Sequence, residues 1–153
     1  MSRSLVCVQV LVREEANIHA VNMDAETPLH FAAGERSEWV EEKREDETAL
    51  LKYLIAAGAD INALTSTRES PLWYAVQADN LPAVRELLAG STDIQLRNPY
   101  GETVLHEAAY RSSLAVVQML VEAGVDVQAR SKTMDLFCTA QQKAVVWILF
   151  NGY

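Results

Sequence analysis

The chain has 153 residues, the size of one ordinary domain, and 50% of them are hydrophobic, which argues against disorder over most of its length. It carries 21 acidic and 13 basic residues and a formal net charge of −8. A surface of that sign repels phosphate backbones and anionic membranes, so we expect no nucleic-acid partner. Cys7 and Cys138 lie at opposite ends of the sequence, a usage typical of reducing compartments, which predicts a cytoplasmic or nuclear location.

The first predicted element is an apolar segment, Leu5 to Val12, which follows Arg3. Gln9 interrupts the segment, and the charged residues 13–15 follow it without a small-residue cleavage pattern, so we expect no signal peptide. A later apolar run, Ala144 to Phe150, is shorter than the about 20 residues that a membrane-spanning helix needs. We therefore expect no membrane insertion.

Two short patterns recur along the chain in one register. The first contains an acidic anchor, and the anchors Asp60, Asp93 and Asp126 are 33 residues apart. A related fragment at 16–20 lies 43 residues before the Asp60 copy. The second pattern begins ten residues after Asn17, Asp60 and Asp93, as Thr27-Pro28-Leu29-His30, Ser70-Pro71-Leu72 and Thr103-Val104-Leu105-His106. Two independent patterns in one register predict a repeat protein.

Each repeat is predicted to contain two short helices. Thr27 and Ser70 are favourable N-caps, and a proline next to each suits the first helical position, where no helical N–H is lost. Gly58 and Gly124 stand where a helix ends in left-handed backbone. The second helix of each repeat has apolar residues three and four apart, which predict one buried stripe: Leu50, Leu51, Leu54 and Ile55, then Val84, Leu87 and Leu88, then Leu114, Val116, Val117, Leu120 and Val121.

The motif at Thr27–His30, followed by Ala32-Ala33, and the segment Ala57-Gly58-Ala59-Asp60-Ile61-Asn62-Ala63 resemble the signature of the ankyrin-repeat family. The resemblance covers about residues 4–153 apart from one insertion. It implies an all-α solenoid of stacked helix-turn-helix units with projecting hairpin loops, because one unit cannot bury its apolar face alone. It also implies structural roles for Thr27, Pro28, His30, Gly58, Asp60, Asp93, Thr103, His106, Gly124 and Asp126, with the histidines tying adjacent repeats together rather than acting in catalysis.

The register divides this single domain, 1–153, into five units. They are an N-terminal half repeat (1–20), a repeat with an acidic insertion near 35–45 (21–63), two repeats (64–96 and 97–129) and a shortened C-terminal capping repeat (130–153). Phe137 and Cys138 occupy the places where the last unit needs Pro and Leu. Capping by partial helices, further repeats beyond the chain and end-to-end self-association all stay open.

The insertion is the main departure from the repeat pattern. From Glu35 to Glu47 there are seven acidic and three basic residues, and Trp39 and Val40 are the large apolar ones. One interpretation is a solvated loop or helix end with Trp39 folded back on its neighbours. The other is an acidic docking element in which Trp39 is the anchor and the charges are those of Glu41 and Glu42.

No pattern of catalytic, metal-ligating or cofactor-binding residues stands out. Three histidines and two cysteines are scattered without CxxC or HExxH spacing, six glycines form no phosphate-binding loop, and no Ser, His and Asp grouping fits a nucleophile site. We therefore expect no metal, no cofactor and no enzyme activity. The alternative left open is a targeting or substrate-recruitment segment of a larger enzyme or effector.

The resemblance also implies where a protein partner of unknown identity binds, namely the hairpin tips and the concave face of the first helices. Carried over position by position, these sites are Asp24, Leu64, Ser66, Gln77, Arg97, Tyr100, Tyr110, Arg111, Arg130 and Lys132. The C-terminal half combines basic side chains with Tyr100 and Tyr110, and tyrosine and arginine are frequent hot-spot residues. We expect this half to bind an acidic or mixed-charge segment of the partner.

Overall fold

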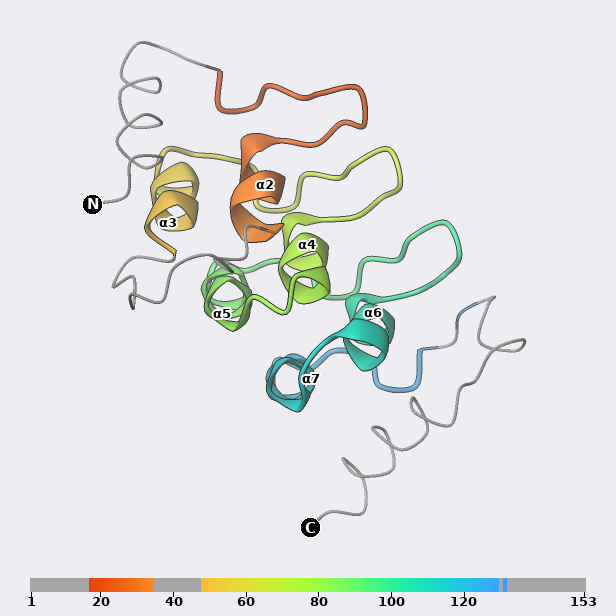
Figure 1. Ribbon diagram of the computed structural model, residues 1–153. Helices are drawn as coiled ribbons and strands as arrows, with labels where there is room; N and C mark the ends of the chain where they lie inside the picture. Colours follow the sequence, from red (N-terminus) through yellow and green to blue (C-terminus); the bar gives the residue numbers. More distant parts are fainter. Residues whose placement is uncertain (1–16, 35–47, 130, 132–153) are drawn as a thin grey trace.

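The computed structural model describes residues 17–34, 48–129 and 131. Six helices and no strand occur within these ranges: α2 (Pro28–Gly34), α3 (Ala49–Ala56), α4 (Pro71–Gln77), α5 (Leu81–Ala89), α6 (Val104–Arg111) and α7 (Leu114–Glu122). Successive helices form three pairs, and the loops between pairs project to one side (Figure 1). This arrangement confirms the all-α solenoid predicted from the sequence.

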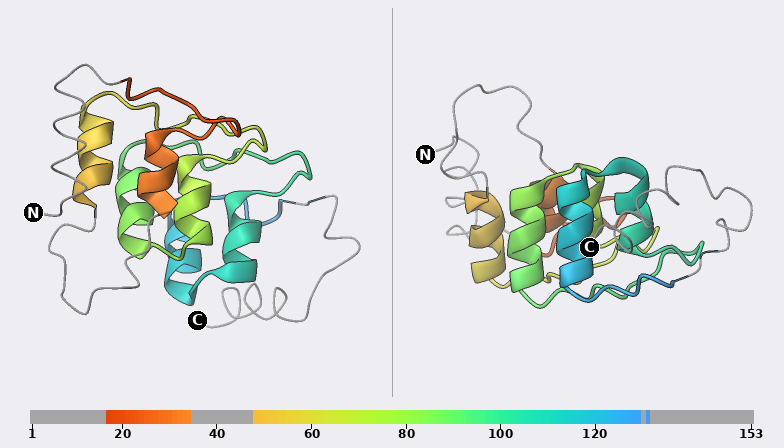
Figure 2. Two further views of the ribbon diagram at one scale, coloured as in Figure 1. Left: turned by 45° about the horizontal axis from the view of Figure 1, so that its top comes forward. Right: turned by 90° about the horizontal axis from the view of Figure 1, so that it is seen from below.

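The pairs stack so that the helices form two layers. The first helices α2, α4 and α6 lie side by side in one layer, and the second helices α3, α5 and α7 form the other (Figure 2). The pairs fall within the repeats predicted at 21–63, 64–96 and 97–129. Most of the terminal units predicted at 1–20 and 130–153 lies outside the described residues, and so does the acidic insertion.

Local sequence signals start these helices as expected. Pro71 is the first residue of α4, and the Ser70 hydroxyl before it accepts a hydrogen bond from the Trp73 N–H at 3.4 Å. Asn80 caps α5 in the same way, accepting from the Ala83 N–H at 3.2 Å. Each such cap satisfies a backbone N–H that has no partner inside the helix.

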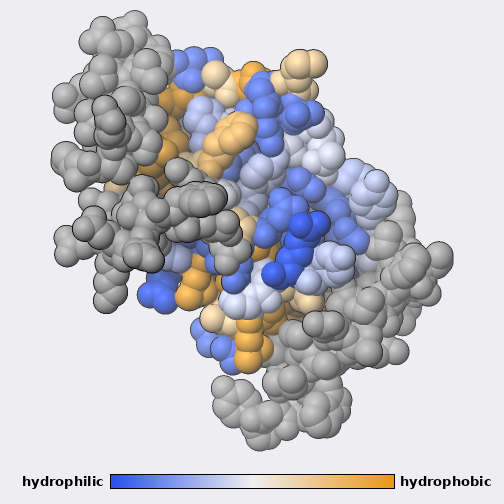
Figure 3. Space-filling view, viewed as in Figure 1, coloured by the Kyte–Doolittle hydropathy of each residue, from blue (hydrophilic) through white to orange (hydrophobic). Residues whose placement is uncertain are grey.

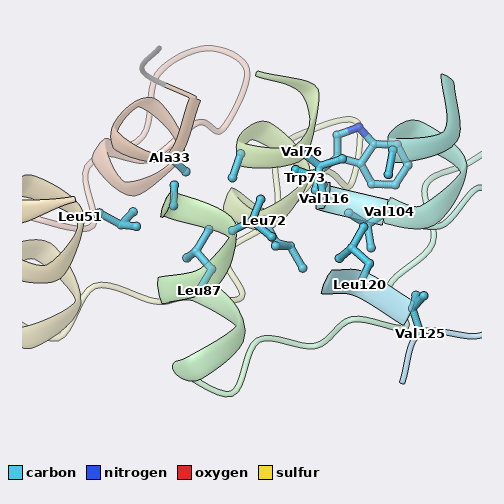
Figure 4. Close-up of a cluster of buried hydrophobic side chains, with 14 of the residues drawn as sticks. Ala33, Leu51, Leu72, Trp73, Val76, Leu87, Val104, Val116, Leu120 and Val125 are labelled. Atoms are coloured by element: carbon cyan, nitrogen blue, oxygen red, sulfur yellow. The ribbon is translucent and has the colours of Figure 1, made fainter. Parts of the chain in front are cut away.

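The core runs through the stack between the two layers (Figure 4). Seven residues of the predicted second-helix stripes are at most 2% exposed: Leu51, Leu54, Val84, Leu87, Val116, Val117 and Leu120. Full burial of such a side chain stabilises the fold by about 1.5–3 kcal/mol. The prediction of burial is wrong for Leu114 of the third stripe, which is 47% exposed. Leu114 stands one helical turn before the exposed Gln118, so it shares the solvent-facing side of α7.

The helix-ending backbone shows one position that glycine spacing did not predict. Gly58 and Gly124 have φ values of 93° and 87°, as expected for left-handed helix ends. The equivalent residue of the middle repeat is Ser91, with a φ of 63°, and not Gly90 one residue earlier. A side chain in this conformation is strained, because its Cβ lies too close to a backbone carbonyl oxygen.

Replacement of Ser91 by Gly should therefore stabilise the fold. We expect Ser91→Gly to raise the free energy of unfolding by about 0.5–1 kcal/mol, the left-handed penalty less the extra chain entropy of glycine. Chemical denaturation measures this change. The matched reverse variant, Gly58→Ser, should lose stability, and equal stability of all three proteins would contradict the assignment.

Candidate protein-binding surface

Polar side chains at the start of the hairpin tips hold the tips in shape. Asn98 Oδ1 accepts hydrogen bonds from the N–H groups of Tyr100 (3.0 Å) and Glu102 (2.9 Å). Asn22 accepts in the same way from Asp24 (3.0 Å) and from the residue two positions further on (2.9 Å). These tip-organising residues were not among those predicted from the sequence. The signal was present, since Asn22, Thr65, Asn98 and Ser131 occupy one register position.

Neighbouring hairpins are also bonded to each other. The Ser66 N–H donates to the Asp24 carbonyl at 2.9 Å, and the Asp93 N–H donates to Asn62 Oδ1 at 2.8 Å. Gln95 repeats the second contact, because its Oε1 accepts from the Asp126 N–H at 3.3 Å. Successive tips therefore form one continuous, cross-linked edge of the molecule.

His30 is bonded both within its own repeat and to the next one. Its Nδ1 accepts a hydrogen bond from the Thr27 N–H at 3.0 Å, and an amide N–H can only donate, so the ring proton lies on Nε2. Nε2 then donates to the carbonyl of Glu69 in the next repeat at 3.2 Å. Burial lowers the pKa of His30, which agrees with a neutral ring.

The other two copies of this position differ from His30. Trp73, which is 4% exposed, stands in the middle repeat and packs in the core. His106 Nδ1 bonds to Thr103 as His30 bonds to Thr27, with the Thr103 N–H at 3.1 Å. The position that corresponds to Glu69 in the repeat after His106 is residue 135, which lies outside the described ranges, so the predicted tie of His106 to a following repeat stays a prediction.

Carboxylates gather where the hairpins meet the first helices. The Tyr74 hydroxyl donates to Glu26 across the repeat boundary, and this bond lowers the pKa of the Glu26 carboxyl. Burial raises the pKa of Glu69 and of Glu107. Repulsion by Glu26 raises the pKa of Glu69 further, and repulsion by Glu69 and Glu102 raises that of Glu107 further. Glu26, Glu69 and Glu102 occupy one register position of the three repeats and form a row of carboxylates. We call this surface of the hairpins and the first helices the inner face. A space-filling view shows polar side chains over it (Figure 3).

The structure brings two of the predicted partner-binding residues together on α6. Tyr110 is 67% exposed, and the Arg111 guanidinium lies 5.7 Å from the centre of its ring, a cation–π distance. Arg111 Nε is also 3.1 Å from a Glu107 carboxylate oxygen. Tyr110 and Arg111 therefore present an aromatic ring and a shared cation on one rigid helix end.

The remaining predicted sites are spread along the hairpin edge. Tyr100 is 61% exposed on its tip, while Arg97 donates to the Gly101 carbonyl at 3.0 Å and pairs with Asp126 at 3.7 Å. Asp24, Ser66 and Gln77 are exposed, and Leu64 is half-buried. Five predicted residues lie outside the described ranges: Trp39, Glu41, Glu42, Arg130 and Lys132.

Comparison with known families agrees with this architecture. A family model described as ankyrin repeats, in three copies, matches residues 40–131, which is more than half of the chain. The chain therefore belongs to the ankyrin-repeat family. No curated protein matches it. Ankyrin repeats are generally protein–protein interaction modules and are typically non-catalytic.

In the part of the chain that the structure describes, every helix falls short of the length and hydrophobicity that a membrane span requires. The His, Cys, Asp and Glu side chains of the same residues form no group of three or more that could hold a metal ion.

The neutral state of His30 predicts an acid-sensitive stack. Its folded-state pKa lies below the ordinary value of 6.5, so the unfolded chain binds the proton more readily. The free energy of unfolding should therefore fall as the pH drops from about 7 to about 5. In His30→Asn the side chain keeps an acceptor for the Thr27 N–H but cannot reach Glu69. The variant should therefore lower the free energy of unfolding by about 1–2 kcal/mol near neutral pH and make that free energy depend less on pH.

Denaturation at a series of pH values measures both proteins. Glu69 and Glu107, whose pKa values are raised by burial, act in the opposite direction, but they are present in wild type and variant alike. The difference between the two profiles thus isolates His30. Parallel profiles would show that the His30 ring is not held neutral.

Proposed function

We propose that this chain is a non-catalytic module that binds a protein segment along its hairpin tips and the inner face of α4 and α6. The observation that carries the proposal is the pair formed by Tyr110 and Arg111. An exposed aromatic ring and a guanidinium on a rigid element match the residue types that dominate binding energy at interfaces. The same surface would serve if the chain recruits substrates for a larger enzyme.

The charges of the inner face favour a mixed-charge segment over a purely acidic one. Arg111 is paired with Glu107, and Arg97 with Asp126, so a partner carboxylate has to share these cations with groups of the chain itself. The nearby row of Glu26, with its lowered pKa, and the half-buried Glu69 offers sites for a partner Lys or Arg. A segment with both signs of charge satisfies the two sets together.

We also propose that the chain works in the cytoplasm or nucleus. The support is the placement of its two cysteines at opposite ends of the sequence, a usage that fits a reducing compartment.

Truncation of the Tyr110 and Arg111 side chains should weaken partner binding. We expect Tyr110→Ala combined with Arg111→Ala to weaken binding at least ten-fold, since hot-spot residues contribute about 2 kcal/mol or more. Affinity pull-down with quantitative mass spectrometry compares wild type, this variant and a control, Arg85→Ala with Gln118→Ala. The control residues are exposed on the second helices, away from the inner face. Proteins captured equally by all three would contradict the proposal.

The acidic insertion is a separate candidate contact. If it docks the partner through Trp39, deletion of residues 35–45 should lower affinity about ten-fold or more, because a buried aromatic anchor carries about 2 kcal/mol. Trp39→Ala in the full chain separates the anchor from the length of the loop. Unchanged affinity in both variants would leave the insertion as a tolerated surface loop.

A further inference from the structure

One register position of the first helices is used for contact with the preceding helix. Tyr74 of α4 bonds to Glu26, its ring meets the His30 ring edge-on at 5.2 Å, and it covers Gly34 of α2. A Cβ on Gly34 would lie 3.4 Å from the Tyr74 ring, in van der Waals contact. The third copy of this position is Glu107, whose side chain is 15% exposed and bonds to Gln77 of α4. At both boundaries the later helix contacts the same register position of the earlier helix, Gly34 or Gln77.

The first copy of this position, Phe31 on α2, is 56% exposed. No described helix packs on this side of α2, which we call the leading face. Phe31 lines an open hollow of about 910 Å³ together with Val21, Pro28, Leu50 and Leu54. Glu26 contributes the acidic group of the wall, and its carboxylate accepts a hydrogen bond from the Tyr74 hydroxyl. The hollow is therefore an apolar site with one anionic edge.

We propose that the leading face of α2 binds a short apolar helix of a protein partner. The helix would lie against α2 as α2 lies against α4, so it continues an interface that the molecule already uses twice. The observed pairs specify its chemistry. A glycine or alanine should face the Phe31 ring, because a Cβ at Gly34 would already be in van der Waals contact with Tyr74 and a longer side chain would displace the ring.

The anionic edge adds a charge requirement. Glu26 stays ionised, because the hydrogen bonds from Tyr74 and Asn22 lower the pKa of its carboxyl. A carboxylate on the docked helix near Glu26 would be repelled, whereas a Lys or Arg there would be attracted. The proposed ligand is thus an apolar helix with a small residue facing Phe31 and no acidic residue near Glu26. It uses residues other than Tyr110 and Arg111, so it is a second binding site, independent of the proposed function.

A peptide with the sequence of α2 is the direct probe, because α2 is the helix that fills the equivalent place against α4. A stapled, fluorescently labelled peptide of residues 27–34 is titrated with the full chain, and anisotropy reports binding. We expect Phe31→Glu to weaken binding at least ten-fold, while Leu114→Glu, at an exposed apolar residue of α7, leaves it within two-fold. A peptide carrying Gly34→Leu should bind wild type at least five-fold more weakly.

Two further measurements keep the outcome unambiguous. Because Phe31 is more than half exposed, Phe31→Glu should leave the circular dichroism spectrum and melting temperature unchanged. A large loss of melting temperature together with no peptide binding would show that a segment of the chain itself fills the hollow. Sedimentation that shows wild type associating with itself and Phe31→Glu remaining a monomer would assign the face to a second copy. Either result overturns the proposal, as does equal peptide binding by Phe31→Glu.

Discussion

The whole structure depends on the fact that a pair of short helices cannot enclose its own apolar surface, so every pair uses its neighbours as part of its core. The first helices pack against one another. Ala32, Ala75 and Ala108 occupy one register position of α2, α4 and α6, and each is buried. Alanine permits this spacing because a larger side chain would push the helices apart. The stack is therefore set by small residues, and the larger leucines and valines fill the space between the layers.

Polar groups follow the same repeat, although the residue types change. The carbonyl of Ala33, near the end of α2, accepts from Asn80 Nδ2 of the next repeat at 3.2 Å. One repeat later, the carbonyl of Val76 accepts from Ser112 Oγ at 2.7 Å. Amide and hydroxyl thus perform one task, the satisfaction of a carbonyl near a helix end by the following unit. This exchange explains how the chain departs from its repeat pattern without losing the stack.

The sequence could predict features that need one residue type at a fixed spacing. Pro71 after Ser70 and the left-handed Gly58 are of this kind, because few other residues meet the steric demand. Leu114 failed because a stripe drawn from apolar character alone ignores which side of the helix a position occupies. The Arg111–Glu107 pair could not be foreseen either, since a long side chain has several partners within reach and only the three-dimensional arrangement selects one.

Differences among the chain's own repeats separate the frame from the recognition surface. Ala32, Ala75 and Ala108 are identical copies of a buried position, so packing dictates the residue there. Gly34, Gln77 and Tyr110 are three copies of another position and share no chemistry. At Gly34 the packing of Tyr74 demands a small residue, whereas Tyr110 is largely exposed and the stack places no demand on it. A large aromatic kept where the fold asks for nothing has a cost in solubility, and contact with another molecule is the physical reason to keep it.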